Sequence, residues 1–98
     1  MSARTVLKKG SSNVFTDLGF AESEAQNLAL RSDLMIRIEK LVRDSGMTQQ
    51  QVAKTLGVSQ PRLNALLKGK IADFSLDALV NMLARAGMQV KMTVKKAA

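Results

Sequence analysis

Side chains suited to binding an anionic partner are concentrated in the centre of the chain, between residues 47 and 72. This segment contains no Asp or Glu, although the whole chain has eight acidic residues. Four side chains that carry positive charge or donate hydrogen bonds follow one another at short intervals: Gln60, Arg62, Asn64 and Lys68. The net charge of the chain is +7 at pH 7, and such an excess favours nucleic acid or an anionic membrane surface. The central segment therefore predicts recognition of a polyanion by charge and hydrogen bonding.

The residue types that most enzymes use for catalysis are missing or isolated. The chain has no His and no Cys, which removes the commonest general base and zinc ligand, thiolate metal sites and disulfides. No nucleophile–base pair or phosphate-binding loop is visible. Four acidic residues show no metal-ligand spacing: Asp17, Glu22, Glu24 and Asp33. We therefore expect no enzyme, no cofactor and no metal site.

The length of 98 residues predicts one domain, and a core this small gains stability from a second copy of the chain. No run of about 18 apolar residues is present, so no transmembrane helix is expected. The basic N-terminus, with Arg4, Lys8 and Lys9, is not followed by the apolar stretch of a signal peptide. These features predict a cytoplasmic protein.

The first half of the chain predicts an arm followed by helical structure. Residues 1–13 are polar and basic and are expected to form a flexible arm with a joint at residues 10–13, and residues 14–98 are expected to form a single domain. Phe15, Leu18 and Phe20 are expected to cover one side of the core.

A capping-box spacing at Ser23 and Gln26 predicts a helix that runs to about residue 31. Apolar residues then recur at helical spacing over residues 34–42 and lead to Gly46, a favourable helix end. This stretch is either a second helix capped by Ser32 or a continuation of the first.

Three shorter helices are expected to follow, each with a start and a stop signal. The expected N-terminal caps are Thr48 (in a capping box with Gln51), Ser59 and Ser75, and the expected ends are Gly57, Gly69 and Gly87. Pro61 falls in a first turn, where its missing N–H costs little. The leucine and methionine stripes of these helices are expected to form the core.

Residues 88–94 alternate between apolar and polar side chains, which predicts a half-buried strand. Its partner is either the arm near residues 5–8 or, as we favour, a second protein chain. The simplest alternative is a tail packed loosely on the helices. The expected fold is therefore mainly α, with one short C-terminal β-strand.

The turn at residues 57–59 joins two short helices, as in a helix-turn-helix. Gly57 can adopt the left-handed backbone conformation that the turn needs, and the small side chain of Ala53 allows the helices to approach. Val58 can fill the gap between them. Each residue type thus has a physical reason at its position.

Residues 47–70 resemble the Cro/repressor-like (XRE) family of helix-turn-helix DNA-binding domains. The matching pattern is Thr48-Gln49, Val52-Ala53, Leu56-Gly57-Val58-Ser59, Leu63, Leu66 and Lys68-Gly69-Lys70. Residues 13–94 are also similar to HigA-type antitoxins of bacterial toxin–antitoxin pairs, through Asn13-Val14-Phe15, Leu30-Arg31-Ser32 and Phe74-Ser75-Leu76 among others. The resemblance implies a five-helix, lambda-repressor-like domain that binds double-stranded DNA as a homodimer, represses its own operon and neutralises a RelE-like toxin.

The resemblance also implies roles for individual residues. Residues 59–68 would be the recognition helix, whose N-terminal end enters the major groove. The implied base-reading residues are Gln60, Arg62, Asn64 and Ala65, and the implied phosphate-binding residues are Thr48, Gln49, Ser59, Lys68 and Lys70. Pro61 departs from the family, which often has a polar residue there, so readout is expected to rest on its neighbours.

Other interpretations of the same residues remain open. Residues 49–51 can be a solvated helix start, Lys68 and Lys70 can be ordinary solvated charges, and Arg62 can form a surface ion pair of little energetic value. The whole motif can also be a scaffold, with the exposed strand or the N-terminal segment binding a partner protein. RNA is less favoured, because the three Phe residues look like packing residues and leave no aromatic side chain for base stacking.

Overall fold

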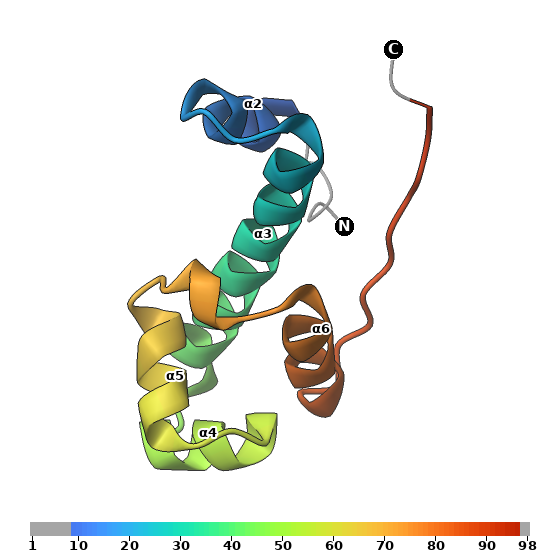
Figure 1. Ribbon diagram of the computed structural model, residues 1–98. Helices are drawn as coiled ribbons and strands as arrows, with labels where there is room; N and C mark the ends of the chain where they lie inside the picture. Colours follow the sequence, from blue (N-terminus) through green and yellow to red (C-terminus); the bar gives the residue numbers. More distant parts are fainter. Residues whose placement is uncertain (1–8, 97–98) are drawn as a thin grey trace.

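The computed structural model describes the backbone of residues 9–96 and the side chains of residues 13–96. Its elements are α2 (Lys9–Asp17), α3 (Glu22–Ser45), α4 (Gln49–Leu56), α5 (Gln60–Leu67), the 3-10 turn η1 (Ile71–Asp73) and α6 (Leu76–Arg85). Helix α3 is the spine of the molecule (Figure 1). Helix α2 crosses one end of it, α4 and α5 lie at the other end, and α6 runs beside it.

The core lies between α3, α4, α5 and α6. Its largest fully buried side chains are Phe74, Ile38, Leu63 and Leu79. Eight further buried side chains complete the cluster: Leu34, Met35, Val52, Ala53, Leu56, Leu66, Met82 and Leu83. The predicted leucine and methionine stripes are therefore core, as expected for a chain with only three aromatic residues.

Helix α3 is continuous, so the second of the two alternatives for residues 23–45 is the correct one. The predicted Ser23 cap is wrong. The N-cap is Ala21, two residues earlier, so the helix begins at Glu22 and has no side-chain cap. Gln26 instead donates a hydrogen bond from Nε2 to the Glu22 carboxylate at 3.3 Å. No Gly or Pro interrupts residues 22–45, and this allows one helix to continue past Ser32.

The N-terminal part of the described chain is more helical than the sequence suggested. Residues 10–13, expected to be a joint, lie inside α2, and residues 1–8 of the expected arm lie outside the described residues. Phe15 is half-buried and meets Phe20 edge to face, with ring centres 6.2 Å apart. Leu18 is 70% exposed, so the expectation that it covers the core is wrong.

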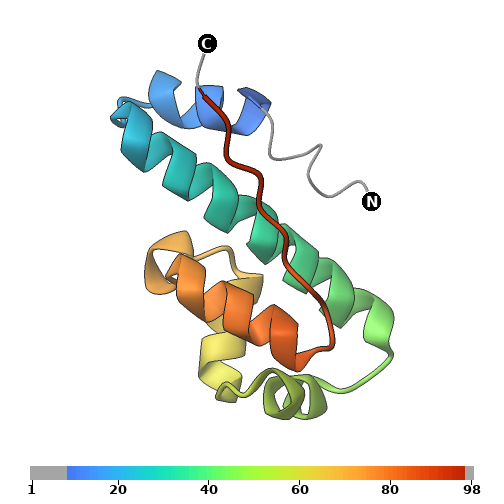
Figure 2. The ribbon, with the colours of Figure 1, turned by 90° about the vertical axis from the view of Figure 1, so that its right-hand side faces the viewer.

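The predicted C-terminal β-strand is absent: residues 88–96 form no strand within the described chain. Residues 88–92 instead line a groove with α3, and the chain beyond them passes across α3 in the view of Figure 2 but stands apart from it in Figure 1. Met88 donates its N–H to the carbonyl of Leu83 at 2.9 Å, and Val90 packs against the core. The alternation of apolar and polar residues does not produce a strand here, because no described segment offers a strand edge to pair with. One of the apolar residues of this pattern, Val94, is 94% exposed. The segment is a tail that packs on the helices near its start, at Val90, and is exposed over residues 91–96.

Candidate nucleic-acid interface

The start of α4 is fixed by the predicted capping box. The Thr48 hydroxyl accepts the N–H of Gln51 at 3.2 Å, and the Gln51 side-chain oxygen accepts the N–H of Thr48 at 3.0 Å. A helix leaves its first N–H groups without intrahelical partners, so those of Gln49 and Gln50 stay open to an anion. Thr48 therefore fixes the helix end at which the predicted phosphate contact would form. Gln49 is exposed at the first helical position.

The turn between α4 and α5 has the predicted geometry. Gly57 has a φ of 76°, which is the left-handed conformation that glycine adopts without strain. Val58 donates its N–H to the carbonyl of Ala53 at 2.9 Å, and its half-buried side chain packs against the core. The Arg85 side chain from α6 lies directly against Gly57. The turn thus sets the angle between the two helices of the motif.

Helix α5 presents one face to the core and the opposite one to solvent. Its N-cap is Ser59, whose hydroxyl accepts the N–H of Arg62 at 3.2 Å. Leu63 and Leu66 are buried, at 0% and 2% exposure. Because successive helical residues are rotated by about 100°, the opposite side carries an exposed surface, which we call the outer face of α5 and define as Gln60, Pro61, Asn64 and Lys68. Ala65 is half-buried at its edge.

Arg62 is the predicted base-reading residue that the structure separates from the outer face. Its guanidinium lies over the Phe74 ring, with Cζ 4.4 Å from the ring centre. Arg62 precedes the buried Leu66 by four residues, so the two side chains leave the helix in similar directions. That spacing is a signal in the sequence that could have placed Arg62 on the flank of α5.

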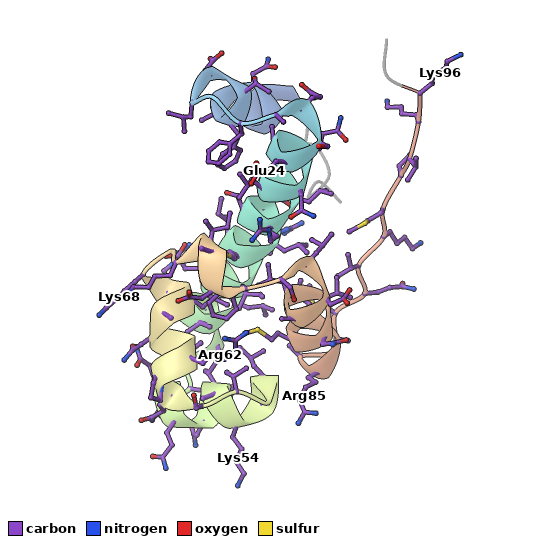
Figure 3. All side chains as sticks on the ribbon, in the orientation of Figure 1. Glu24, Lys54, Arg62, Lys68, Arg85 and Lys96 are labelled. Atoms are coloured by element: carbon purple, nitrogen blue, oxygen red, sulfur yellow. The ribbon has the colours of Figure 1, made fainter. Side chains whose placement is uncertain are left out.

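The basic side chains of the motif are free of ion pairs. Within residues 13–96 the one ion pair joins Lys40 to Asp44, both on α3. Lys68 is the C-cap of α5 and Lys70 precedes η1, and both are exposed. Lys54, which the sequence analysis did not single out, points away from α4, as Lys68 does from α5 (Figure 3). Residues 47–72, which contain α4, the turn and α5, therefore carry only basic or neutral side chains.

Arg31, on α3, is a further residue that the sequence analysis missed. Its guanidinium donates to the carbonyl of Ile71 at 3.1 Å and to that of Phe74 at 3.2 Å. No local pattern could have identified it, because these partners lie 40 and 43 residues away along the chain. Arg31 holds the segment after α5 against α3.

A buried carboxyl group lies away from this end. Asp33 on α3 is 3% exposed and faces a groove between α3 and residues 88–92. Burial raises the pKa of Asp33, and the nearby charge of Arg37 partly lowers it. The described residues contain no cluster of three metal-ligating side chains, and no described helix is long and apolar enough to span a membrane.

Comparison with known proteins agrees with this geometry. A search of curated proteins found no match. A family model described as a helix-turn-helix domain matches residues 14–95, which is most of the 98-residue chain. The matched range includes α4, the turn and α5, and DNA binding is the activity that this motif supports. The chain belongs to the helix-turn-helix domain family.

Proposed function

We propose that the protein is a sequence-specific transcriptional repressor that binds a palindromic operator as a homodimer and occludes a promoter. The outer face of α5 carries this proposal. Its polar side chains are exposed, and no carboxylate occurs in residues 47–72 to repel a phosphate backbone. The mechanism is binding without chemistry, which is consistent with a chain that lacks His and Cys.

In this proposal α5 lies in the major groove. Gln60 and Asn64 pair with base edges, and Ala65 contacts a thymine methyl. The phosphate contacts come from Thr48, Gln49, Ser59, Lys68 and Lys70, which lie at the ends of α4 and α5. Pro61 lies in the middle of the outer face and has no hydrogen-bond donor. Specificity therefore rests on the side-chain amides of Gln60 and Asn64. Two copies place their α5 helices about 34–36 Å apart, one turn of DNA.

A titration with the DNA upstream of the protein's own gene tests the proposal. The control is a scrambled duplex of the same length and composition, and both are measured at two salt concentrations. We expect selective binding that persists at the higher salt. Equal, salt-sensitive binding to both duplexes would contradict a sequence-reading repressor and favour the protein-interaction scaffold.

A matched pair of variants locates the contact. Lys68→Ala removes a phosphate contact and is expected to reduce the slope of log affinity against log salt by about one. Lys91→Ala removes an exposed charge from the tail beside α3 and is expected to leave the slope almost unchanged. Equal effects of the two variants would argue against α5 as the docking helix.

We further propose that the protein is a member of the XRE family and the antitoxin of a type II toxin–antitoxin pair, repressing its own operon. Support comes from the HigA-like residues and from an apolar surface away from the motif. Val14 on α2 and Leu18 in the turn directly after it are 55% and 70% exposed, and α2 lies at the opposite end of α3 from α4 and α5 (Figure 1). A RelE-like toxin bound there would leave α5 free for DNA.

Co-expression with the product of the neighbouring gene tests this finer proposal. We expect the two proteins to copurify and the toxicity of the partner to be suppressed. Leu18→Lys should weaken the complex, whereas Lys54→Ala should not, because Lys54 lies at the α4 end. Unchanged toxicity in the presence of the wild-type protein would exclude an antitoxin role.

A further inference from the structure

We propose that Arg62 is a positioning residue, which, together with Arg31, clamps Phe74 and thereby fixes the recognition helix on the spine of the domain. This inference rests on the proposed DNA-binding function and changes the role of one residue within it. Arg62 acts through Phe74 and does not contact DNA.

The first half of the clamp is the contact between Arg62 and the Phe74 ring. The guanidinium carbon lies 4.4 Å from the ring centre, well within the range of about 6 Å in which a cation is attracted to an aromatic face. Phe74 is fully buried, while Arg62 as a whole is exposed. The flat guanidinium is thus part of what covers the ring, and its remaining surface faces solvent.

The second half holds the backbone of the same residue. Arg31 donates to the carbonyls of Phe74 and Ile71 at 3.2 and 3.1 Å, and its own orientation is fixed by a 2.7 Å bond from Nε to the Asn27 side-chain oxygen. Hydrogen bonds from a charged donor are stronger than neutral ones. Phe74 is therefore attached to α3 through its backbone and to α5 through its ring.

This attachment matters because α5 is short. With eight residues it has about two turns, too few to be a stable helix alone, so packing determines its position. Leu63 and Leu66 anchor its middle and C-terminal part in the core. Arg62 adds a contact in the first turn, two residues from Gln60, where a small displacement would weaken base contacts generally.

The geometry argues against a direct base contact by Arg62. Its side chain leaves α5 on the side of the buried Leu66, away from the outer face. To reach a base, the guanidinium would have to leave the Phe74 ring and uncover a core residue. The polar side chains of Gln60 and Asn64 meet no such obstacle.

The test compares Arg62→Ala with Asn64→Ala, an exposed change on the same helix. The probe is the duplex that the wild-type protein enriches from a random library, together with all its single-base-pair variants. Affinities are measured at a temperature where circular dichroism shows each protein fully folded. We expect Arg62→Ala to bind about fivefold more weakly, by the same factor on every duplex and with an unchanged salt slope. Asn64→Ala should relax discrimination at one position.

A double-variant cycle provides an independent readout. Nη1 of Arg31 serves both carbonyls while Nε binds Asn27, so Arg31→Lys, which keeps the charge on a single nitrogen, cannot keep all three bonds and should also weaken binding uniformly. Its effect should not add to that of Arg62→Ala, because the two act through one residue. This pair avoids truncating the buried Phe74 ring, a change that risks unfolding the domain.

Several results would overturn the positioning role while leaving the DNA-binding function intact. Relaxed specificity at one base pair would make Arg62 a base reader, and a salt slope lowered by about one would make it a phosphate contact. A lower melting temperature with unchanged affinity of the folded protein would leave it a purely structural residue. If the wild-type protein enriches no sequence, the proposed function fails and the positioning role fails with it.

Discussion

The guanidinium of Arg62 lies 4.4 Å from the centre of the Phe74 ring, so a charged side chain of α5 covers a fully buried aromatic residue. The backbone of that same residue is held to α3 by Arg31. Phe74 is thus contacted by two arginines from separate helices, and it connects the spine of the domain to α5, the proposed recognition helix.

Truncation of Phe74 should be the most damaging change to an aromatic residue in this chain. Phe74→Ala removes a fully buried ring and should lower the free energy of unfolding by about 3–5 kcal/mol. Phe20→Ala is the matched control, because Phe20 is 39% exposed, lies outside the core cluster and meets Phe15 edge to face, and its cost should be about 1 kcal/mol. Urea denaturation measures both, and equal losses would contradict the assigned core.

The helix caps should contribute measurably to stability. Thr48→Ala and Ser59→Ala each remove a side-chain acceptor for a helix N–H and should cost about 1 kcal/mol. Ser23→Ala is the control, because Ser23 lies inside α3 and caps nothing, and alanine is favourable there. Thermal unfolding of the three variants would refute this account if Ser23→Ala were as harmful as the other two.

A side chain at Gly57 should strain the turn of the motif. Gly57→Ala forces a left-handed conformation on an L-residue, at a cost of about 1–2 kcal/mol, and its Cβ would also displace the end of the Arg85 side chain. Gly69→Ala has the same backbone penalty at a φ of 77° but meets open space. Gly57→Ala should therefore lose only slightly more stability than Gly69→Ala. This difference should disappear when Arg85 is also changed to Ala. A large excess that persists there would show that something other than Arg85 opposes the new side chain.

Stability should respond to the buried carboxyl of Asp33. Burial raises the pKa of Asp33 in the folded state above its ordinary value of 3.8, so the folded protein binds the proton more tightly than the unfolded chain does. The free energy of unfolding therefore decreases as pH rises from near 3.8 through the pKa that Asp33 has in the folded protein. Asp33→Asn should stabilise the protein at neutral pH, and the advantage should shrink on acidification.

The control for this pH dependence is Asp44→Asn. Asp44 is exposed and its ion pair with Lys40 is a surface contact of little energetic value, so the change should have a small effect across the pH range. Chemical denaturation at pH 7 and at pH 4 measures both variants. An Asp33→Asn variant that is less stable than the wild type at pH 7 would contradict the assigned burial.

The features that the sequence predicted correctly are local ones. The Thr48–Gln51 capping box and the Ser59 and Ser75 caps each join residues only three positions apart. Such hydrogen bonds depend on a few neighbouring residues, so their pattern can be recognised without the rest of the chain. Ser23 shows the limit of this reasoning. It has capping-box spacing with Gln26, but α3 begins one residue before it, at Glu22, and Ser23 does not cap the helix.

The errors concern segments whose conformation depends on distant partners. Residues 10–13 have the composition of a loop but are helical in α2, which packs on α3. Residues 88–94 alternate like a strand, yet their surroundings are helices and offer no strand edge. In both cases tertiary surroundings overrode a local preference.

The sequence by itself determined the helix-turn-helix, its caps and turn, and the absence of acidic residues from the motif at residues 47–72. Only the tertiary structure decided that Arg62 leaves the outer face of α5 for the Phe74 ring and that Arg31 holds the backbone beneath it. The reason is distance along the chain. A cap is complete within one helical turn, whereas Arg31 and its acceptors are 40 and 43 residues apart and meet only when α3 and the segment after α5 pack together.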